Sequence, residues 1–168
     1  MNYNGSKSFN KRLRRRSLID LLMILISNKI RYVFIFVLIF MWFRNDYYKK
    51  MAWNAVISAG ITLFINFFIK LFFFRPRPFV KRRIGILIPS KEDSSFPSKH
   101  TLLVFAVSTT IFLYERSLGS IMLVLSVLTG FSRIWVGHHY VSDIIGSAFI
   151  AIITSSILEK NVWKQKNN

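Results

Sequence analysis

The sequence of 168 residues contains no cysteine and only seven Asp and Glu residues. Without cysteine the chain can form no disulfide, no thiolate nucleophile and no cysteine-based metal site, and it gives no information about redox compartment. It also lacks internal repeats and low-complexity segments, and its only long polar loop is 75–96. Because carboxylates are scarce, the 24 Lys and Arg residues leave a formal net charge of +17, which favours an anionic partner.

Apolar residues dominate what is present. They make up 52% of the chain, 16% of the chain is aromatic, and the mean hydropathy is +0.39, too apolar for a soluble domain of this size. We therefore expect a membrane protein. Its basic residues lie between long apolar runs, so the expected partners are anionic lipid and phosphate rather than nucleic acid. The basic start is followed by no small-x-small cleavage site, so we expect that segment to be retained.

The apolar runs predict how often the chain crosses the membrane, since about 20 apolar residues are needed for one crossing. Clear candidates are 51–74, 98–114, 118–136 and 140–158. The region 18–43 is interrupted near Ser27 and predicts either an interfacial or re-entrant helix with one crossing, or two short crossings. The expected fold is an all-α polytopic transmembrane bundle of five to six helices. It forms one domain over 1–168, with a basic tail (1–17), a loop (75–97) and a polar tail (159–168).

Small and polar residues recur along one face of three of these runs, where another helix would pack. Ordinary helix packing would produce such faces, but it does not explain why each of them includes an ionisable group at a helix end. The three faces are Asn54, Ser58, Thr62, Asn66 and Lys70; Ser126, Gly130 and Arg133; and His139, Asp143, Ser147 and Ala151.

The pair His139 and Asp143 is the sharpest candidate for chemistry. The two residues are four apart and therefore share one helix face. A carboxylate there can accept the imidazole N–H and stabilise the cation formed when the other nitrogen bonds to phosphorus or takes a proton. Alternatively, Asp143 is a helix-start acid that interacts with the macrodipole. A metal site built from His138, His139 and His100 is a third interpretation, although no carboxylate cluster accompanies these histidines.

Two further segments carry basic or anion-binding groups. After Lys70, the prolines of RPRP stiffen a short loop whose arginines can bind phosphate as rigid forks. Basic residues at a helix end also serve as anchors to lipid headgroups. In SFPSKHT, Pro97 suits the first position of a helix, which would leave the N–H groups near Ser98, Lys99 and His100 free for an anion.

Together these segments resemble the three-part signature of the type 2 phosphatidic acid phosphatase superfamily, Lys-x6-Arg-Pro, Pro-Ser-Gly-His and Ser-Arg-x5-His-x3-Asp. The resemblance is closer to one branch, the bacterial undecaprenyl-diphosphate phosphatases of the bacitracin-resistance type, and it covers about residues 51–158. Lys99 stands where the general pattern has Gly. The matching residues are Lys70, Arg77 and Pro78; Pro97, Ser98 and His100; and Ser132, Arg133, His139 and Asp143.

The resemblance implies a metal-independent hydrolase without a cofactor, which dephosphorylates a polyprenyl diphosphate lipid in the cell membrane through a phosphohistidine. In this scheme His139 attacks phosphorus, Asp143 orients it, and His100 protonates the leaving oxygen. His138 is structural. The phosphate is held by Lys70, Arg77, Arg133 and the N–H groups near Ser98 and Lys99, with Pro78, Pro97 and Ser132 in support.

Two other functions remain open from the sequence. One is a lipid phosphate monoesterase acting on phosphatidic acid or phosphatidylglycerophosphate, and the other is a non-catalytic basic membrane scaffold. The cluster Lys81, Arg82 and Arg83 is expected to tune headgroup affinity without a catalytic role.

The side of the membrane on which the site lies depends on the crossings. Six Lys and Arg residues before Leu18 place the N-terminus inside. Five crossings would then put the site in the cytoplasm and six would put it outside. The resemblance favours an extracytoplasmic site.

Overall fold

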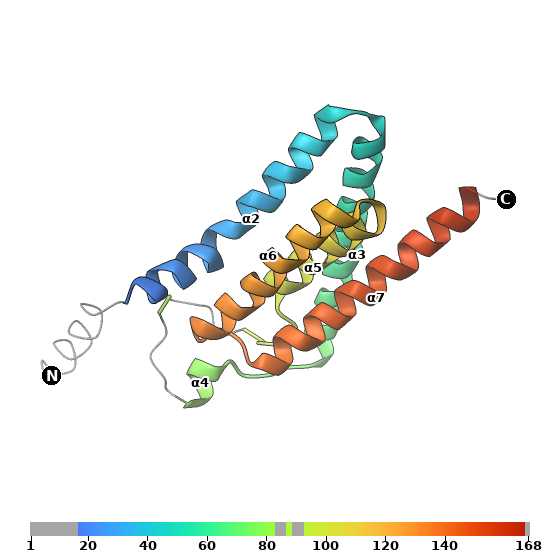
Figure 1. Cartoon of the computed structure of the whole chain (residues 1–168). Helices are drawn as coiled ribbons and strands as arrows, with labels where there is room; N and C mark the ends of the chain where they lie inside the picture. Colours follow the sequence, from blue (N-terminus) through green and yellow to red (C-terminus); the bar gives the residue numbers. More distant parts are fainter. Residues whose placement is uncertain (1–16, 83–86, 89–92, 167–168) are drawn as a thin grey trace, which may run out of the picture.

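The computed structural model describes residues 17–82, 87–88 and 93–166, and the regular structure within these ranges is all helical. Five long helices lie together as one bundle, and a short helix lies near the loop at one end (Figure 1). The expected all-α bundle is confirmed. The helices are α2 (Leu18–Arg44), α3 (Asp46–Phe72), α4 (Pro78–Arg82), α5 (Lys99–Tyr114), α6 (Arg116–Trp135) and α7 (Val141–Lys166).

Helix α5 forms the centre of the bundle. It packs against α2, α3, α6 and α7, and its side chains are buried on nearly every side between Thr101 and Ile111. A helix of 16 residues is about 24 Å long, which is shorter than the ~30 Å hydrocarbon core of a bilayer. Its 16 residues are therefore too few to span the hydrocarbon core as a straight helix.

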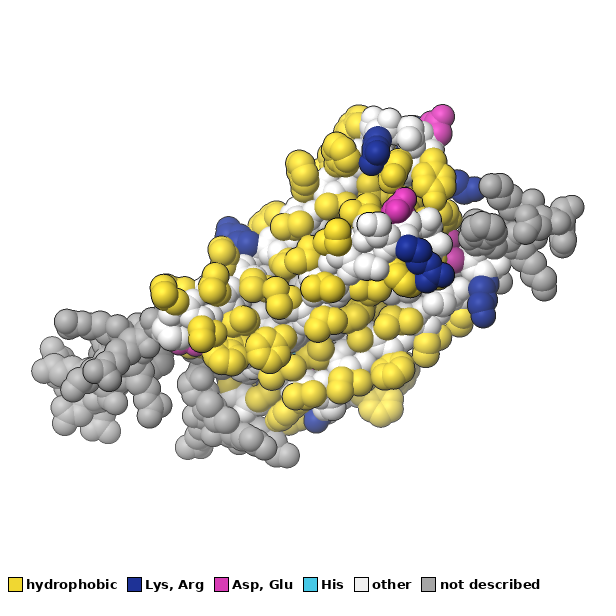
Figure 2. Space-filling model, viewed as in Figure 1, with side chains coloured by type: hydrophobic (Ala, Val, Ile, Leu, Met, Phe, Trp, Pro, Cys, Tyr) yellow, Lys and Arg dark blue, Asp and Glu magenta, His cyan; other side chains and the backbone are white. Residues whose placement is uncertain are grey.

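The outer surface of the bundle is apolar. Large hydrophobic side chains such as Phe36, Phe64, Val124 and Phe149 are exposed, and hydrophobic atoms cover most of the face shown in Figure 2. By length and composition, α2, α3, α6 and the Val141–Lys160 part of α7 are able to cross a membrane, and α5 is a shorter apolar helix. The chain is a multi-pass membrane protein, as its composition predicts.

Helix α2 runs without interruption through the polar stretch after Ile26. It begins with a capping box in which the Ser17 side chain accepts from the Asp20 N–H and the Asp20 side chain accepts from the Ser17 N–H. Trp135 at the end of α6 donates to Asp20 at 2.9 Å. The region 18–43 therefore supplies one crossing and not two, and residue 17 lies at the same end of the bundle as the loop 75–97. Consequently, an inward residue 17 and an outward site cannot both be correct.

Small polar residues join the helices at the predicted faces. Ser58 of α3 and Ser155 of α7 share a hydrogen bond of 2.6 Å between their hydroxyl groups, and Ser108 of α5 and Ser126 of α6 share one of 2.7 Å. These contacts are typical of membrane helices, whose interfaces use small and polar residues because apolar surface can face lipid.

Several element boundaries differ from the sequence predictions, and α3 begins five residues earlier than expected, at Asp46. Helix α5 begins at Lys99 with Ser98 as N-cap, so Pro97 precedes the helix and is not its first residue. The loop 75–97 contains the short α4. Helix α7 continues to Lys166 and so includes most of the expected polar tail.

Candidate active site

The three motifs meet at a cavity of about 190 Å³ at the end of the bundle where α5 and α7 begin. Groups from the ends of α3 and α6, from the loop after α3 and from the start of α5 surround it. The cavity gathers four cations, one carboxylate and two histidines within a bundle whose outer surface is apolar. Its lining residues are Lys70, Arg77, Asp93, Lys99, His100, Arg133 and His139.

His139 follows a tight turn after α6. Gly137 in that turn has φ of 84°, a left-handed conformation that side-chain-bearing residues rarely adopt. His139 is 4% exposed, and its Nδ1 lies 2.7 Å from the carbonyl oxygen of Ser95. Since a carbonyl can only accept, Nδ1 carries the hydrogen, and in the neutral ring Nε2 keeps its lone pair.

The surroundings of His139 keep this ring neutral. Burial lowers the pKa of His139 below its ordinary value, and the charges of Arg133 and Arg77 lower it as well. Asp143 and the Ser95 carbonyl act in the opposite direction but do not reverse the shift. A neutral imidazole with a free Nε2 lone pair is the form that a nucleophile needs.

Asp143 is fully buried and lies 3.8 Å from His139 Nδ1. This distance is too long for the expected direct hydrogen bond, which the Ser95 carbonyl makes instead. One carboxylate oxygen accepts from Arg75 Nη1 at 2.6 Å, and the other accepts from the N–H of Tyr140 at 2.9 Å. The second contact caps the first turn of α7, so Asp143 serves as a helix-start acid and also places negative charge beside the imidazole.

Arg133 and His100 present hydrogen-bonding capacity to the cavity. Arg133 is 6% exposed and donates to the Ser27 hydroxyl of α2 at 2.9 Å. Its Nε has no hydrogen-bond partner among the described residues. The His100 side chain lines the same cavity and makes no hydrogen bond within the described part of the chain. Both groups are therefore available to a ligand.

Lys70 and Arg77 share a carboxylate that sequence reasoning did not anticipate. Asp93 lies 2.6 Å from Arg77 Nη2 and 3.4 Å from Lys70 Nζ. Burial alone would raise the pKa of Asp93, but the charges of Arg77 and Lys70 hold it below the ordinary value. Asp93 is therefore ionised at neutral pH.

The remaining motif residues are not among those that line the cavity. The Ser98 N–H, expected to be free for an anion, donates to the Ser147 hydroxyl at 2.8 Å because α7 packs against this turn. Ser132 donates to the carbonyl of Thr129 within its own helix. Pro78 begins α4, and Pro97 is buried before α5. Their supporting role stays a prediction.

His138 is not among the residues that line the cavity. His138 is 3% exposed, and its Nε2 lies 2.8 Å from the Ile88 carbonyl oxygen. Burial and the nearby cationic groups lower the pKa of His138 to about 4.

Within the described ranges, no group of three or more His, Cys, Asp or Glu side chains is placed to hold a metal ion. The side chains of Lys81, Arg82 and Arg83 lie outside the described residues.

Sequence reasoning did not single out four residues of the site, although it named some of them as part of a longer segment. Ser95 acts through its backbone carbonyl, which leaves no trace in a sequence pattern. Asp93 lies in a polar loop without periodicity, and the basic loop gave no reason to single out Arg75. Ser27 did carry a signal, since it interrupts an apolar run, but the signal suggested a break in the helix.

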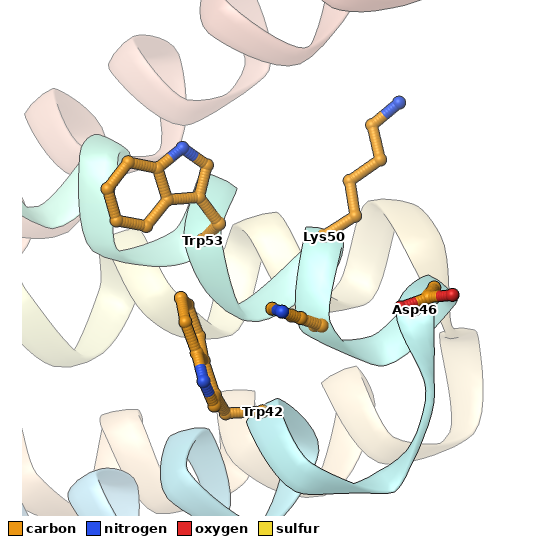
Figure 3. A pocket seen from close by; sticks show the side chains of 5 residues that line it. Trp42, Asp46, Lys50 and Trp53 are labelled. Carbon is orange, nitrogen blue, oxygen red and sulfur yellow. The ribbon is translucent and has the colours of Figure 1, made fainter.

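A second cavity, of about 370 Å³, lies at the opposite end of the bundle (Figure 3). It is lined by Trp42, Asp46, Lys49, Lys50 and Trp53 at the turn between α2 and α3. The two indole rings are 6.1 Å apart, and Lys50 extends away from them. Its lining contains no histidine, and tryptophan and lysine side chains of this kind are common where helices meet the membrane interface.

Comparison with known proteins identifies the family of this chain. The model of the PAP2 superfamily matches residues 51–167. Undecaprenyl-diphosphatase BcrC from Bacillus subtilis is 38% identical over 154 residues, which cover 91% of this chain and 80% of that protein. The chain belongs to the PAP2 superfamily.

Solved PAP2-like structures share the fold. The crystal structure of Aquifex aeolicus LpxE has a TM-score of 0.74 and 27% sequence identity, covering 87% of this chain and 88% of that one. A transmembrane PAP2-type phosphatidylglycerolphosphate phosphatase from Bacillus subtilis has a TM-score of 0.70 and 18% identity, covering 97% and 89% of the respective chains. At 18% identity, the second match supports the fold alone.

Proposed function

We propose that this PAP2 protein dephosphorylates undecaprenyl diphosphate to undecaprenyl phosphate, thereby recycling the cell-wall lipid carrier and conferring bacitracin resistance. The observation that carries the proposal is the cavity in which the neutral His139 faces the same space as His100 and the cations Lys70, Arg77 and Arg133. The similarity to undecaprenyl-diphosphatase BcrC over nine-tenths of the chain supports the choice of substrate.

In the first step, Nε2 of His139 attacks the terminal phosphorus. The bond from that phosphorus to the bridging oxygen breaks, and His100 donates a proton to this oxygen as undecaprenyl phosphate leaves. Arg77, Arg133 and Lys70 stabilise the charge on the transferred phosphoryl group, which is the main demand of phosphoryl transfer. The Nδ1–H bond to Ser95 fixes the ring, and the Asp143 carboxylate stabilises the charge that the ring acquires.

In the second step, water hydrolyses the phosphohistidine. His100, now unprotonated, takes a proton from the water as its oxygen attacks phosphorus, and the bond from phosphorus to Nε2 breaks. Inorganic phosphate is released, and His139 returns to its neutral form. Because the cations of the cavity neutralise the phosphoryl charge, neither step requires a divalent ion.

We further propose that the cavity faces the extracytoplasmic side, as the family resemblance favours. The helix ends that flank the short turns at the opposite end of the bundle carry Arg44, Lys49, Lys50 and Arg116, and basic residues close to the ends of membrane helices favour the cytoplasm. Since α2 crosses once, this orientation also places residue 17 outside, against the expectation from the basic N-terminal tail.

The test measures phosphate release by the purified full-length protein in detergent. Undecaprenyl diphosphate, phosphatidic acid and phosphatidylglycerophosphate are compared, each with and without excess EDTA. We expect the diphosphate to be the preferred substrate, with full activity in EDTA and acid-labile phosphate trapped on the protein. A preference for a monophosphate lipid would favour the monoesterase, and an inert protein would favour the scaffold. Loss of activity in EDTA that zinc or magnesium restores would indicate a metal enzyme.

A further inference from the structure

Asp93 occupies a place in the cavity where a substrate phosphate would be expected. Its Oδ1 accepts a hydrogen bond from Arg77 Nε at 2.9 Å and lies 2.6 Å from Arg77 Nη2, while its Oδ2 lies 3.4 Å from Lys70 Nζ. Two of the three cations that we assign to the phosphate therefore already hold an anion from the protein itself.

The carboxylate and a phosphate compete for the same edge of Arg77. The guanidinium group binds carboxylates and phosphates through paired N–H groups, and Asp93 occupies the Nε and Nη2 pair. The remaining Nη1 lies 3.4 Å from the carbonyl oxygen of His138. A phosphate that binds Arg77 as a fork through Nε and Nη2 must therefore displace Asp93.

Other contacts hold the two cations in place when the carboxylate leaves. Lys70 Nζ donates to the carbonyl of Ser94 at 2.9 Å, and Arg77 Nε lies 3.3 Å from the backbone carbonyl of Asp93. The Asp93 side chain is 50% exposed, so it can rotate into solvent while its backbone stays anchored. Exchange of one anion for another thus requires a side-chain rotation and no movement of the helices.

We propose that Asp93 is an internal competitor for the phosphate position. Its carboxylate holds Lys70 and Arg77 in the unloaded cavity, is displaced by the terminal phosphate of the substrate, and returns to help displace the phosphate product. This inference rests on the proposed function, because it gives Asp93 a place in the same reaction.

The experiment first measures binding without turnover. Inorganic phosphate is titrated into full-length His139→Ala protein in detergent, with and without Asp93→Asn. The amide keeps the shape of the side chain but loses its charge, so we expect the dissociation constant for phosphate to fall about three- to tenfold. Asp93→Glu, which retains a carboxylate, should leave it within about twofold. Asp46→Asn, at the opposite end of the bundle, controls for the change in net charge.

The same substitution is then tested in the active enzyme with undecaprenyl diphosphate. Stronger inhibition by phosphate and a lower KM, without a rise in kcat, would support competition. Unchanged or weaker phosphate binding in Asp93→Asn, together with a fall in kcat, would overturn the proposal and identify Asp93 as a residue that positions the cations. If Asp93→Asn does not fold, Asp93→Ser gives the same comparison. Tighter phosphate binding by a protein that hydrolyses no diphosphate would overturn the proposed function and leave the competition standing.

Discussion

Substitution of His139 tests its assignment as the nucleophile. His139→Ala removes the proposed nucleophile from a 4% exposed position at the end of the bundle, outside the main apolar core. We expect turnover to fall at least about a hundredfold, while the elution profile and melting temperature in detergent stay near those of the parent. Retention of more than a few per cent of the activity would exclude the phosphohistidine.

The pH profile tests the role of Asp143. Protonation of His139 removes the nucleophile, so kcat/KM should decline on the acid side only as the pH falls through the lowered pKa of His139, below the ordinary range of histidine. Because Asp143 raises the pKa of His139, Asp143→Asn should move this acid limb to still lower pH while it reduces kcat. A fall in kcat with an unmoved acid limb would mean that Asp143 only caps α7.

We expect Lys99 to distinguish substrates by their leaving groups. It lines the cavity beside His100, and in the described part of the chain its side chain makes no hydrogen bond or ion pair. Cleavage of a diphosphate expels a second phosphate next to His100, whereas a lipid monophosphate expels a neutral alcohol. Lys99→Gly should therefore lower kcat/KM for undecaprenyl diphosphate about tenfold and that for phosphatidic acid by less than about threefold. Equal losses for the two substrates would show that Lys99 does not sense the leaving group.

At the residue scale, sequence reasoning finds groups that carry a chemical signature. The spacing of lysine, arginine and histidine residues predicted five members of the site, and all five line one cavity: Lys70, Arg77, His100, Arg133 and His139. The sequence could not predict the Ser95 contact, because any residue has a backbone carbonyl. It could not pair Asp93 with Arg77 either, since that contact depends on how the loop folds back.

At the scale of elements, glycine positions set how closely helices approach. A Cβ at Gly119 would overlap the Phe112 backbone in the hairpin of α5 and α6, whereas a Cβ at Gly60 in α3 would meet nothing within 4 Å. We expect Gly119→Ala to lower the melting temperature in detergent, with a cost of about 1–3 kcal/mol. Gly60→Ala should be neutral or stabilising, because alanine favours a helix more than glycine does. A neutral Gly119→Ala would mean that the hairpin relaxes freely.

Helix positions were predictable because about 20 apolar residues leave few alternatives in a bilayer. The exception was α2, where polar residues suggested a break. Ser27 is instead buried against Arg133, so a polar residue inside an apolar run served the site and did not interrupt the helix. Hydropathy alone cannot distinguish these two cases, because it ignores which side chain lies opposite.

For the whole molecule, orientation is directly testable because the native chain has no cysteine. Ser17→Cys and Val141→Cys place single exposed thiols at the end of the bundle that holds the site, and Ser117→Cys places one at the other end. In intact cells, a membrane-impermeant maleimide should label the first two and spare the third. Labelling of Ser117→Cys alone would place the site in the cytoplasm, and opposite results for Ser17→Cys and Val141→Cys would contradict the single crossing of α2.

The short central helix determines how deep the chemistry takes place. If the turn after Tyr114 lies at one boundary of the hydrocarbon, a helix about 24 Å long ends several ångströms short of the other boundary, and His100 sits at that depth. A phosphate group reaches it most readily when a hydrocarbon tail carries it down from the headgroup layer. In that position we expect the site to favour phosphates attached to lipids over free phosphate esters in water, whatever the headgroup.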